Sequence, residues 1–196
     1  MAKKTGRNTR GRIISAAWQL FYQQGYDNTT VEEIIEASGT SKGSFYHYFE
    51  GKDALLSSLS YLFDEKYEEL MDRIPEDMDR FDVLMLLNRE LFAMIENSIA
   101  LDLLARLYSS QLVTRGEKHL LDHNRIYYKL LRRIVSEGQQ RGELRADVTV
   151  NEVVRVYAMC ERALIYDWCL SEGSYSLMQY GRTMLPRFLD SFREKK

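Results

Sequence analysis

Residues 29–52 constrain the fold more than any other part of the chain, because they carry the start and stop signals of two short helices. Thr30 and Glu33 match a capping box, in which each side chain bonds the backbone N–H of the other residue. Gly39 can end the first helix in a left-handed conformation, and Ser41 can cap the second. Two short helices joined by a tight turn that contains glycine predict a helix-turn-helix, which places one helix end in the major groove of DNA.

The second helix of this motif has two different faces. We expect it to run from residue 41 to about residue 49. At 100° per residue, Phe45 and Phe49 fall on one side, where they can pack against neighbouring helices. Tyr46 and His47 point away from that side, so core packing does not explain them.

Three residues near the start of the second helix suit a contact with DNA. Gly43 costs the helix about 1 kcal/mol relative to alanine, but a position without a side chain lets DNA come close. Lys42 and Ser44 flank it, and the helix N-terminus offers free N–H groups to phosphate. Lys52 opens the next helix, where a cation opposes the helix dipole, so a phosphate partner explains it better than exposure to solvent.

Composition and charge fit a DNA-binding protein with an acidic body. The chain has 196 residues and a formal net charge of −2, but residues 1–52 carry +2 and the remainder carries −4. A basic N-terminal end on an acidic protein suits the presentation of that end to DNA. No apolar run approaches the roughly 18 residues of a membrane span, and the sequence has no signal peptide. We therefore expect a cytoplasmic protein that does not bind membranes.

The same segment resembles the DNA-binding domain of the TetR/AcrR family of bacterial transcriptional regulators. The resemblance covers about residues 9–56 and is densest in Thr-Thr-Val-x-x-Ile and in Ser-Gly-Thr-Ser-Lys-Gly-Ser-Phe-Tyr-His-Tyr-Phe-x-x-Lys-x-x-Leu-Leu. It implies phosphate contacts near both ends of the motif and major-groove contacts from the start of the second helix. The DNA-binding residues expected in this way are Thr30, Ser41, Lys42, Gly43, Ser44, Tyr46, His47, Tyr48 and Lys52. Which of Lys42, Ser44 and His47 reads bases stays open.

The rest of the chain has the apolar periodicity of helices and lacks the sustained alternation of strands. We expect helices over about residues 52–73, 80–95, 99–112, 120–141, 150–171 and 174–193. The predicted fold is all-α. It has an N-terminal three-helix helix-turn-helix DNA-binding domain in residues 1–52, followed by a larger helical effector-binding and dimerisation domain in residues 53–196.

The last two helices carry apolar stripes wider than one neighbour needs. A thicker core within one chain would also use such stripes. A helix-turn-helix that reads palindromic DNA needs a two-fold partner, however, and the resembled family dimerises through its last two helices. We therefore expect a homodimer joined by a four-helix bundle. Its predicted interface residues are Val154, Tyr157, Glu161, Leu164, Ile165, Trp168, Leu177, Tyr180, Gly181, Met184 and Phe188.

The family resemblance also implies a small-molecule cavity among the middle helices. The candidate lining mixes aromatic rings and sulfur with a few polar groups, as ligand sites do, although core packing explains each residue equally well. The candidates are Phe92, Ile95, Leu104, Tyr108, Tyr127, Met159, Arg162 and Tyr166. If Arg162 is buried, it needs Glu161, Asp167 or an anionic ligand as a partner.

Other functions have weaker support in the sequence. His119 and His123 have the spacing of a helical metal pair, but a solvated helix start explains their polar surroundings, so we expect no metal site and no cofactor. Cys160 and Cys169 point in opposite directions on one helix and cannot form a disulfide with each other. No nucleophile motif indicates an enzyme.

The sequence therefore predicts a dimeric repressor that a small-molecule effector releases from a palindromic double-stranded DNA operator. One alternative is a DNA-binding regulator that answers to a protein partner. The other is a helical enzyme or metal protein with an incidental DNA-binding motif.

Overall fold

The computed structural model describes residues 2–113 and 118–194, and within these ranges the chain forms helices and no strand, as predicted. The helices are α1 (Ala2–Gln24), α2 (Val31–Ser38), α3 (Lys42–Tyr48), α4 (Lys52–Leu56), α5 (Leu59–Met71), α6 (Arg80–Ser98), α7 (Leu101–Val113), α8 (Ile126–Gln140), α9 (Val150–Leu170) and α10 (Leu177–Leu189), with short 3₁₀ helices η1 (His119–Leu121) and η2 (Asp190–Phe192). None of the described helices is long and apolar enough to span a membrane.

The chain divides into two compact units. The first unit comprises Met1–Tyr61 and Asp102–Val113, and the second comprises Leu62–Leu101 and Thr114–Lys196. The first unit therefore combines the N-terminal helices with nearly all of α7. The functional division into residues 1–52 and 53–196 stays a prediction.

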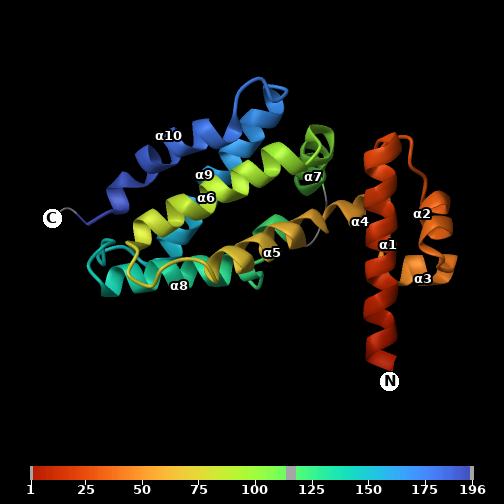
Figure 1. The fold of residues 1–196 in the computed structure, drawn as a ribbon, viewed down its shortest axis with the longest axis horizontal. Helices are drawn as coiled ribbons and strands as arrows, with labels where there is room; N and C mark the ends of the chain where they lie inside the picture. Colours follow the sequence, from red (N-terminus) through yellow and green to blue (C-terminus); the bar gives the residue numbers. More distant parts are fainter. Residues whose placement is uncertain (1, 114–117, 195–196) are drawn as a thin grey trace. The chain divides into compact units, whose positions relative to one another are not determined.

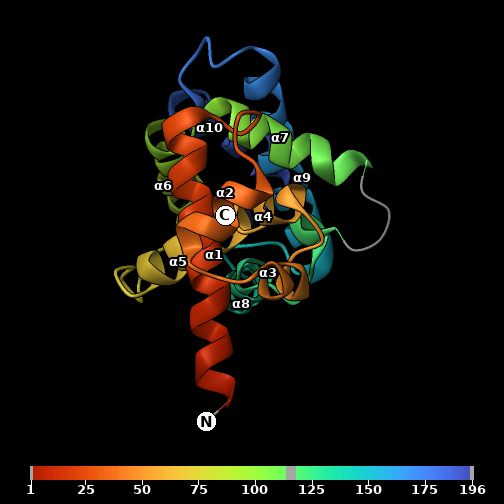
Figure 2. The same ribbon diagram turned by 90° about the vertical axis from the view of Figure 1, so that its right-hand side faces the viewer.

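The N-terminal helices of the first unit enclose a small apolar core. α1 packs on both α2 and α3, which lie beside it in Figure 2. The apolar residues buried in these helices and in α4 include Ile13, Ala17, Phe21, Ile34, Phe45, Leu55 and Leu56. This core holds the two short helices, which are too short to be stable alone.

The predicted helix-turn-helix is confirmed, together with its caps. The hydroxyl of Thr30 accepts a hydrogen bond from the Glu33 N–H at 3.2 Å, and the Glu33 carboxylate accepts one from the Thr30 N–H at 2.7 Å. Gly39 ends α2 with a φ of 57°, in the left-handed region that favours glycine. Ser41 caps α3 by accepting from the Ser44 N–H at 3.1 Å. Local sequence signals therefore fix both ends of the turn.

The single helix expected over residues 52–73 is wrong, because the structure divides it into α4 and α5. The hydroxyls of Ser57, Ser58 and Ser60 each donate to the carbonyl three residues earlier, at 2.6, 2.5 and 2.6 Å. The backbone N–H groups of Ser58 and Ser60 also bond three residues back, at 3.0 and 3.1 Å. Serine side chains compete with the regular helical pattern in this way, and here they accompany the break.

The second unit is built mainly from α6, α8, α9 and α10. α10 packs on α6 and α9, and α8 packs on α6 and α9 (Figure 1). The expected helix over residues 120–141 begins later than predicted, at Ile126, and follows the short helix η1. The side chain of Asp122 accepts from the Asn124 N–H at 2.8 Å, a local turn that precedes α8.

Candidate DNA-binding, dimer and effector sites

The helix α3 is anchored by two phenylalanines and presents its other side to solvent. Phe45 is 0% exposed and Phe49 is 4% exposed, and their rings lie 5.9 Å apart. Tyr46 is 48% exposed, and His47 is exposed beside it. The structure therefore brings the predicted anchors to the core and the predicted DNA-facing pair to the surface.

The start of α3 is open to an approaching molecule. Lys42 and Gly43 are exposed, and a Cβ built on Gly43 would meet nothing closer than the Ser41 hydroxyl at 4.0 Å. Lys42 makes a 3.9 Å ion pair with Glu32 between side chains that are each more than two-thirds exposed. Such a surface pair contributes little to stability, so the ammonium of Lys42 is available to a phosphate or a base.

The remaining predicted residues of α3 are partly engaged within the protein. The Ser44 hydroxyl lies 2.9 Å from that of Ser41, so it hydrogen-bonds the N-cap residue of its own helix. Tyr48 is half-buried, and its ring lies 4.8 Å from the His47 ring in an edge-on contact. Thr30 is exposed at the start of α2, although its side chain is tied to Glu33.

Lys52 has partners inside the protein that the sequence did not indicate. Its Nζ donates to the backbone carbonyls of Tyr26 and Thr29 at 2.6 and 2.8 Å, and it lies 4.2 Å from the centroid of the Tyr26 ring. These contacts explain a lysine at the start of α4 without any phosphate. The phosphate contact of Lys52 stays a prediction, but the unfavourable position of this lysine no longer supports it, because the two internal bonds explain that position.

Sequence reasoning also missed the residues that surround Tyr26. The Tyr26 hydroxyl donates to the Asp53 carboxylate, and Arg106 of α7 lies 4.9 Å from the Tyr26 ring while it pairs with Asp27. Burial and the neighbouring Asp53 raise the pKa of Tyr26, so its hydroxyl stays protonated as a donor. The cluster joins three segments of the first unit, and no local sequence pattern predicts such a contact.

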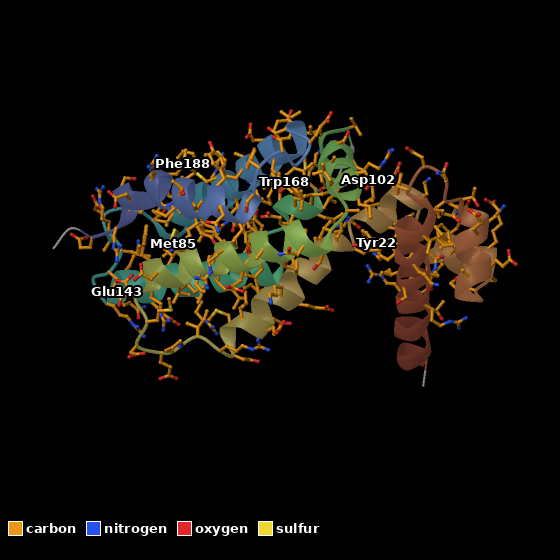
Figure 3. All side chains as sticks on the ribbon, turned by 45° about the horizontal axis from the view of Figure 1, so that its top comes forward. Tyr22, Met85, Asp102, Glu143, Trp168 and Phe188 are labelled. Atoms are coloured by element: carbon orange, nitrogen blue, oxygen red, sulfur yellow. The ribbon has the colours of Figure 1, made fainter. Side chains whose placement is uncertain are left out.

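Most residues predicted for the dimer interface lie inside the protomer. The buried members of that set are Val154, Tyr157, Glu161, Leu164, Ile165, Trp168, Leu177 and Gly181. A residue buried by its own chain cannot offer a surface to a partner, so this part of the prediction is wrong. Of the predicted set, Met184 is half-buried, whereas Tyr180 and Phe188 are 41% and 44% exposed. Figure 3 labels one residue of each kind, the buried Trp168 and the exposed Phe188.

A different set of apolar residues lies exposed on α9. Met159, Tyr166 and Leu170 are 53%, 45% and 65% exposed. They are spaced by seven and four residues and so share one face of the helix. This exposed face of α9 and the exposed Tyr180 and Phe188 of α10 are apolar surfaces that a partner could cover.

The residues predicted to line the effector cavity fall into separate groups. Phe92, Ile95 and Tyr127 are buried in the second unit, whereas Leu104 and Tyr108 belong to the first unit. Arg162 is only half-buried, so its guanidinium reaches solvent and the acidic or anionic partner that a buried arginine needs is not required; it donates to the Tyr128 hydroxyl at 3.1 Å. Met159 and Tyr166 are exposed and cannot line an enclosed cavity, so their assignment to the cavity is wrong.

A buried carboxylate lies at the centre of the second unit. Glu161 is 3% exposed and accepts hydrogen bonds from the Tyr127 hydroxyl at 2.6 Å and the Asn88 amide at 2.8 Å. The Tyr67 hydroxyl lies 3.4 Å from both carboxylate oxygens. Burial raises the pKa of Glu161, and the hydrogen bonds from these neighbours oppose that rise. An acidic residue within the apolar stripe of α9 was the sequence signal for this network.

Comparison with known proteins identifies the relatives of this chain. Residues 13–59 match the family model of bacterial regulatory proteins, tetR family. The chain is 28% identical over 189 residues to the HTH-type transcriptional regulator TtgR of Pseudomonas putida, covering 90% of this chain and 87% of TtgR. It is 23% identical over 188 residues to the fatty acid metabolism regulator protein of Bacillus subtilis, covering 94% of this chain and 95% of that protein.

Solved structures show the same fold. Thermus thermophilus FadR, a TetR-family transcriptional repressor solved in complex with lauroyl-CoA, matches this structure with a TM-score of 0.74 at 24% identity over 92% of each chain. The helix-turn-helix geometry, the family match and the full-length relatives agree. The chain belongs to the TetR family of bacterial DNA-binding transcriptional regulators.

Proposed function

We propose that the protein is a dimeric repressor that binds a palindromic operator through two copies of α3 and is released by a small-molecule effector. The exposed N-terminal half of α3, anchored from behind by Phe45 and Phe49, is the observation that carries the proposal. It presents Lys42 and Gly43, and His47 is exposed in the last turn of the same helix, an arrangement that suits entry into the major groove. In this role the protein acts on cytoplasmic DNA and is not an enzyme.

The dimer is supported by the exposed apolar side chains of α9 and α10. Met159, Tyr166 and Leu170 on one helix and Tyr180 and Phe188 on the other would be covered by a second copy. A two-fold pair of helix-turn-helix units reads half-sites separated by about one helical turn of DNA, near 34 Å. The two copies of α3 must therefore be held at a fixed spacing.

The effector is proposed to act on that spacing. Nearly all of α7 belongs to the first unit, although α7 follows directly after α6 of the second unit. A ligand that favours one arrangement of the second unit could therefore act on the DNA-binding helices through α7 and through the α4–α5 junction. Coupling of this kind is typically about 1–3 kcal/mol. Because Thermus FadR was solved with lauroyl-CoA, acyl-CoA thioesters are suitable first probes.

Operator binding tests the proposal directly. The protein should shift and footprint a palindromic segment upstream of its own gene, with an affinity that falls as salt rises. Lys42→Ala should lower this affinity and reduce the salt slope by about 1 if Lys42 contacts a phosphate. Lys129→Ala, on the exposed side of α8, is the matched control and should change neither quantity. No footprint on any DNA, in the presence of a folded protein, would contradict the proposal.

The effector is tested separately by thermal stabilisation. A ligand at 100 times its dissociation constant should add about 2.7 kcal/mol to the free energy of unfolding. A metabolite that stabilises the protein and weakens operator binding supports release by a small molecule. Operator binding that answers only to an added protein would instead favour a regulator controlled by a protein partner.

A further inference from the structure

The carboxylate of Glu161 is held by neutral groups from three other helices. One oxygen accepts from the Asn88 amide of α6 at 2.8 Å, and the other accepts from the Tyr127 hydroxyl of α8 at 2.6 Å. Tyr67 of α5 approaches both oxygens. Hydrogen bonds from neutral donors satisfy the lone pairs of the carboxylate but leave its negative charge uncompensated.

No cation of the described residues forms a salt bridge with Glu161. Arg125 pairs with Asp64 at 2.7 Å, and both of those side chains are at most 9% exposed. Arg162, one residue after Glu161, bonds the Tyr128 hydroxyl instead. A buried carboxylate without a counter-ion is unfavourable for folding, and perturbed ionisable groups of this kind concentrate at functional sites.

Aromatic rings line the same place. The rings of Tyr67 and Tyr127 have centroids 5.2 Å apart, and those of Tyr127 and Tyr128 have centroids 4.8 Å apart in an edge-on arrangement. The faces of such rings attract a cation, and the attraction is stronger in a desolvated site than in water. A carboxylate next to several tyrosines therefore combines the two features that recognise an organic cation.

A surface groove reaches this network through Asn88. The groove lies between α6 and α10 and has a volume of about 180 Å³. Its lining combines apolar residues with one acidic and two basic residues: Met78, Asp82, Met85, Leu86, Asn88, Arg89, Gly181, Arg182 and Pro186. Figure 3 labels Met85 in this region. Methionine side chains adapt easily to a new neighbour. A ligand in the groove would need to displace the Asn88 amide to reach the Glu161 carboxylate.

We propose that Glu161, Tyr67 and Tyr127 bind the effector through a cationic group, a protonated amine or a quaternary ammonium attached to an apolar body. The inference rests on the proposed function in taking this ligand as the effector. The cation supplies the missing counter-charge for Glu161, and the tyrosine rings surround it. The apolar body lies in the groove against Met78, Met85 and Pro186.

The experiment compares three probes that share a ten-carbon chain. Decyltrimethylammonium, decyl sulfate and decanol, each below its micelle or solubility limit, are titrated into the full-length protein and into Glu161→Gln. Binding is followed by the thermal unfolding midpoint and by tryptophan fluorescence. We expect the wild type to bind the cation at least about tenfold more tightly than the anion. In Glu161→Gln this preference should fall to near unity.

Two further variants separate recognition from folding. Glu152→Gln removes an exposed carboxylate from the same helix and should keep the full preference for the cation. Tyr127→Phe keeps the ring but removes a donor that competes for Glu161, so it should bind the cation at least as well as the wild type. The far-UV circular dichroism signal of each variant verifies its helix content.

The relative affinities of the wild type for the three probes are sufficient to overturn the inference. If the wild type binds the three probes equally, or prefers the anion, the proposed cation site is wrong. The same holds if a folded Glu161→Gln variant keeps the wild-type preference for the cation. Operator binding that lauroyl-CoA releases, and that decyltrimethylammonium leaves unchanged, would refute this inference and leave the proposed repressor function intact.

Discussion

The Nζ of Lys52 donates a hydrogen bond to the backbone carbonyl of Tyr26 at 2.6 Å, and the same ammonium lies 4.2 Å from the centroid of the Tyr26 ring. A second bond at 2.8 Å reaches the carbonyl of Thr29, directly before the N-cap of α2. One side chain at the start of α4 therefore fixes the turn that leads into the helix-turn-helix. Lys52 therefore stabilises this turn within the protein, whether or not it also contacts DNA.

Lys52→Met should destabilise the protein while it keeps most of the aliphatic packing. The change removes two charge-assisted hydrogen bonds and a cation–π contact, so we expect the free energy of unfolding to fall by roughly 2 kcal/mol. Urea unfolding followed by circular dichroism measures the loss.

The matched control is Lys42→Met, at an exposed lysine of α3. It should change stability by less than about 0.5 kcal/mol, because surface substitutions away from buried features have small effects. Equal stability of the Lys52 and Lys42 variants would show that the internal bonds of Lys52 contribute nothing measurable.

Gly43→Ala should stabilise the isolated protein and weaken its binding to DNA. Beyond the adjacent residues and the helix's own backbone, a Cβ at this position meets nothing closer than the Ser41 hydroxyl at 4.0 Å, and alanine favours a helix over glycine by up to about 1 kcal/mol. The added methyl group would stand where we propose that DNA approaches the start of α3. Unfolding curves and operator titrations on the same preparation measure both effects. Unchanged operator affinity would place the DNA contact elsewhere on the helix.

Gly181→Ala should destabilise the second unit. A Cβ on Gly181 would lie 2.5 and 2.6 Å from two ring carbons of Phe92, which is itself fully buried and cannot move away freely. Overpacking of this kind typically costs about 1–3 kcal/mol. Gly11→Ala in α1 is the control, because its added Cβ has no neighbour within 4 Å beyond the adjacent residues and the backbone of its own helix. The control should be neutral or stabilising in the same thermal unfolding assay.

Charges placed on the exposed apolar face of α10 should separate the proposed dimer. Tyr180 and Phe188 are both more than 40% exposed, so the double change Tyr180→Glu and Phe188→Glu leaves the protomer core untouched. Sedimentation velocity should report a dimer for the wild type and a monomer for the double variant. Tyr22→Glu, at a 51% exposed tyrosine of α1, should remain dimeric. If the double variant still sediments as a dimer, the dimer interface does not include this face of α10.

Stability should depend on pH through Glu161. Burial raises the pKa of this carboxyl, so its contribution to stability is present below its unfolded pKa, near 4.5, and is lost as pH rises through the folded value. We expect the wild type to lose stability relative to Glu161→Gln from about pH 4.5 upward. Tyr67, Tyr127 and Tyr157 face the same site, but burial raises their pKa values well above 10, so they do not titrate in this range. If the free energies of unfolding of the wild type and of Glu161→Gln change with pH in parallel, Glu161 does not titrate in this range.

Local signals predicted the helix-turn-helix correctly, because its caps depend on residues three or four positions apart. The junction between α4 and α5 was missed for the opposite reason. Apolar periodicity continues through residues 57–60, whereas the hydroxyls of Ser57, Ser58 and Ser60 bond the backbone and favour a break. Periodicity records which residues are buried, and it does not record competition for backbone carbonyls.

The two faces of α9 were exchanged in the sequence interpretation. Periodicity places Tyr157, Glu161 and Trp168 on one face of the helix and Met159 and Tyr166 on another, and the structure agrees with this grouping. It assigns the first face to the protomer core and the second to the surface. A helix with apolar residues on both faces does not reveal which face meets its own chain, because both are covered in an assembly.

The inclusion of α7 in the first unit has a practical consequence for chimeric regulators. Cutting the chain after Tyr61 separates Asp27 from its partner Arg106 and removes one of the two cations that flank the Tyr26 ring. A hybrid that fuses residues 1–61 to a foreign sensor domain would therefore lack the contacts that Arg106 makes with Asp27 and with the Tyr26 ring. Hybrids whose recipient helix carries an arginine at the position that corresponds to Arg106 should be more stable than hybrids designed only by the boundary at residue 61.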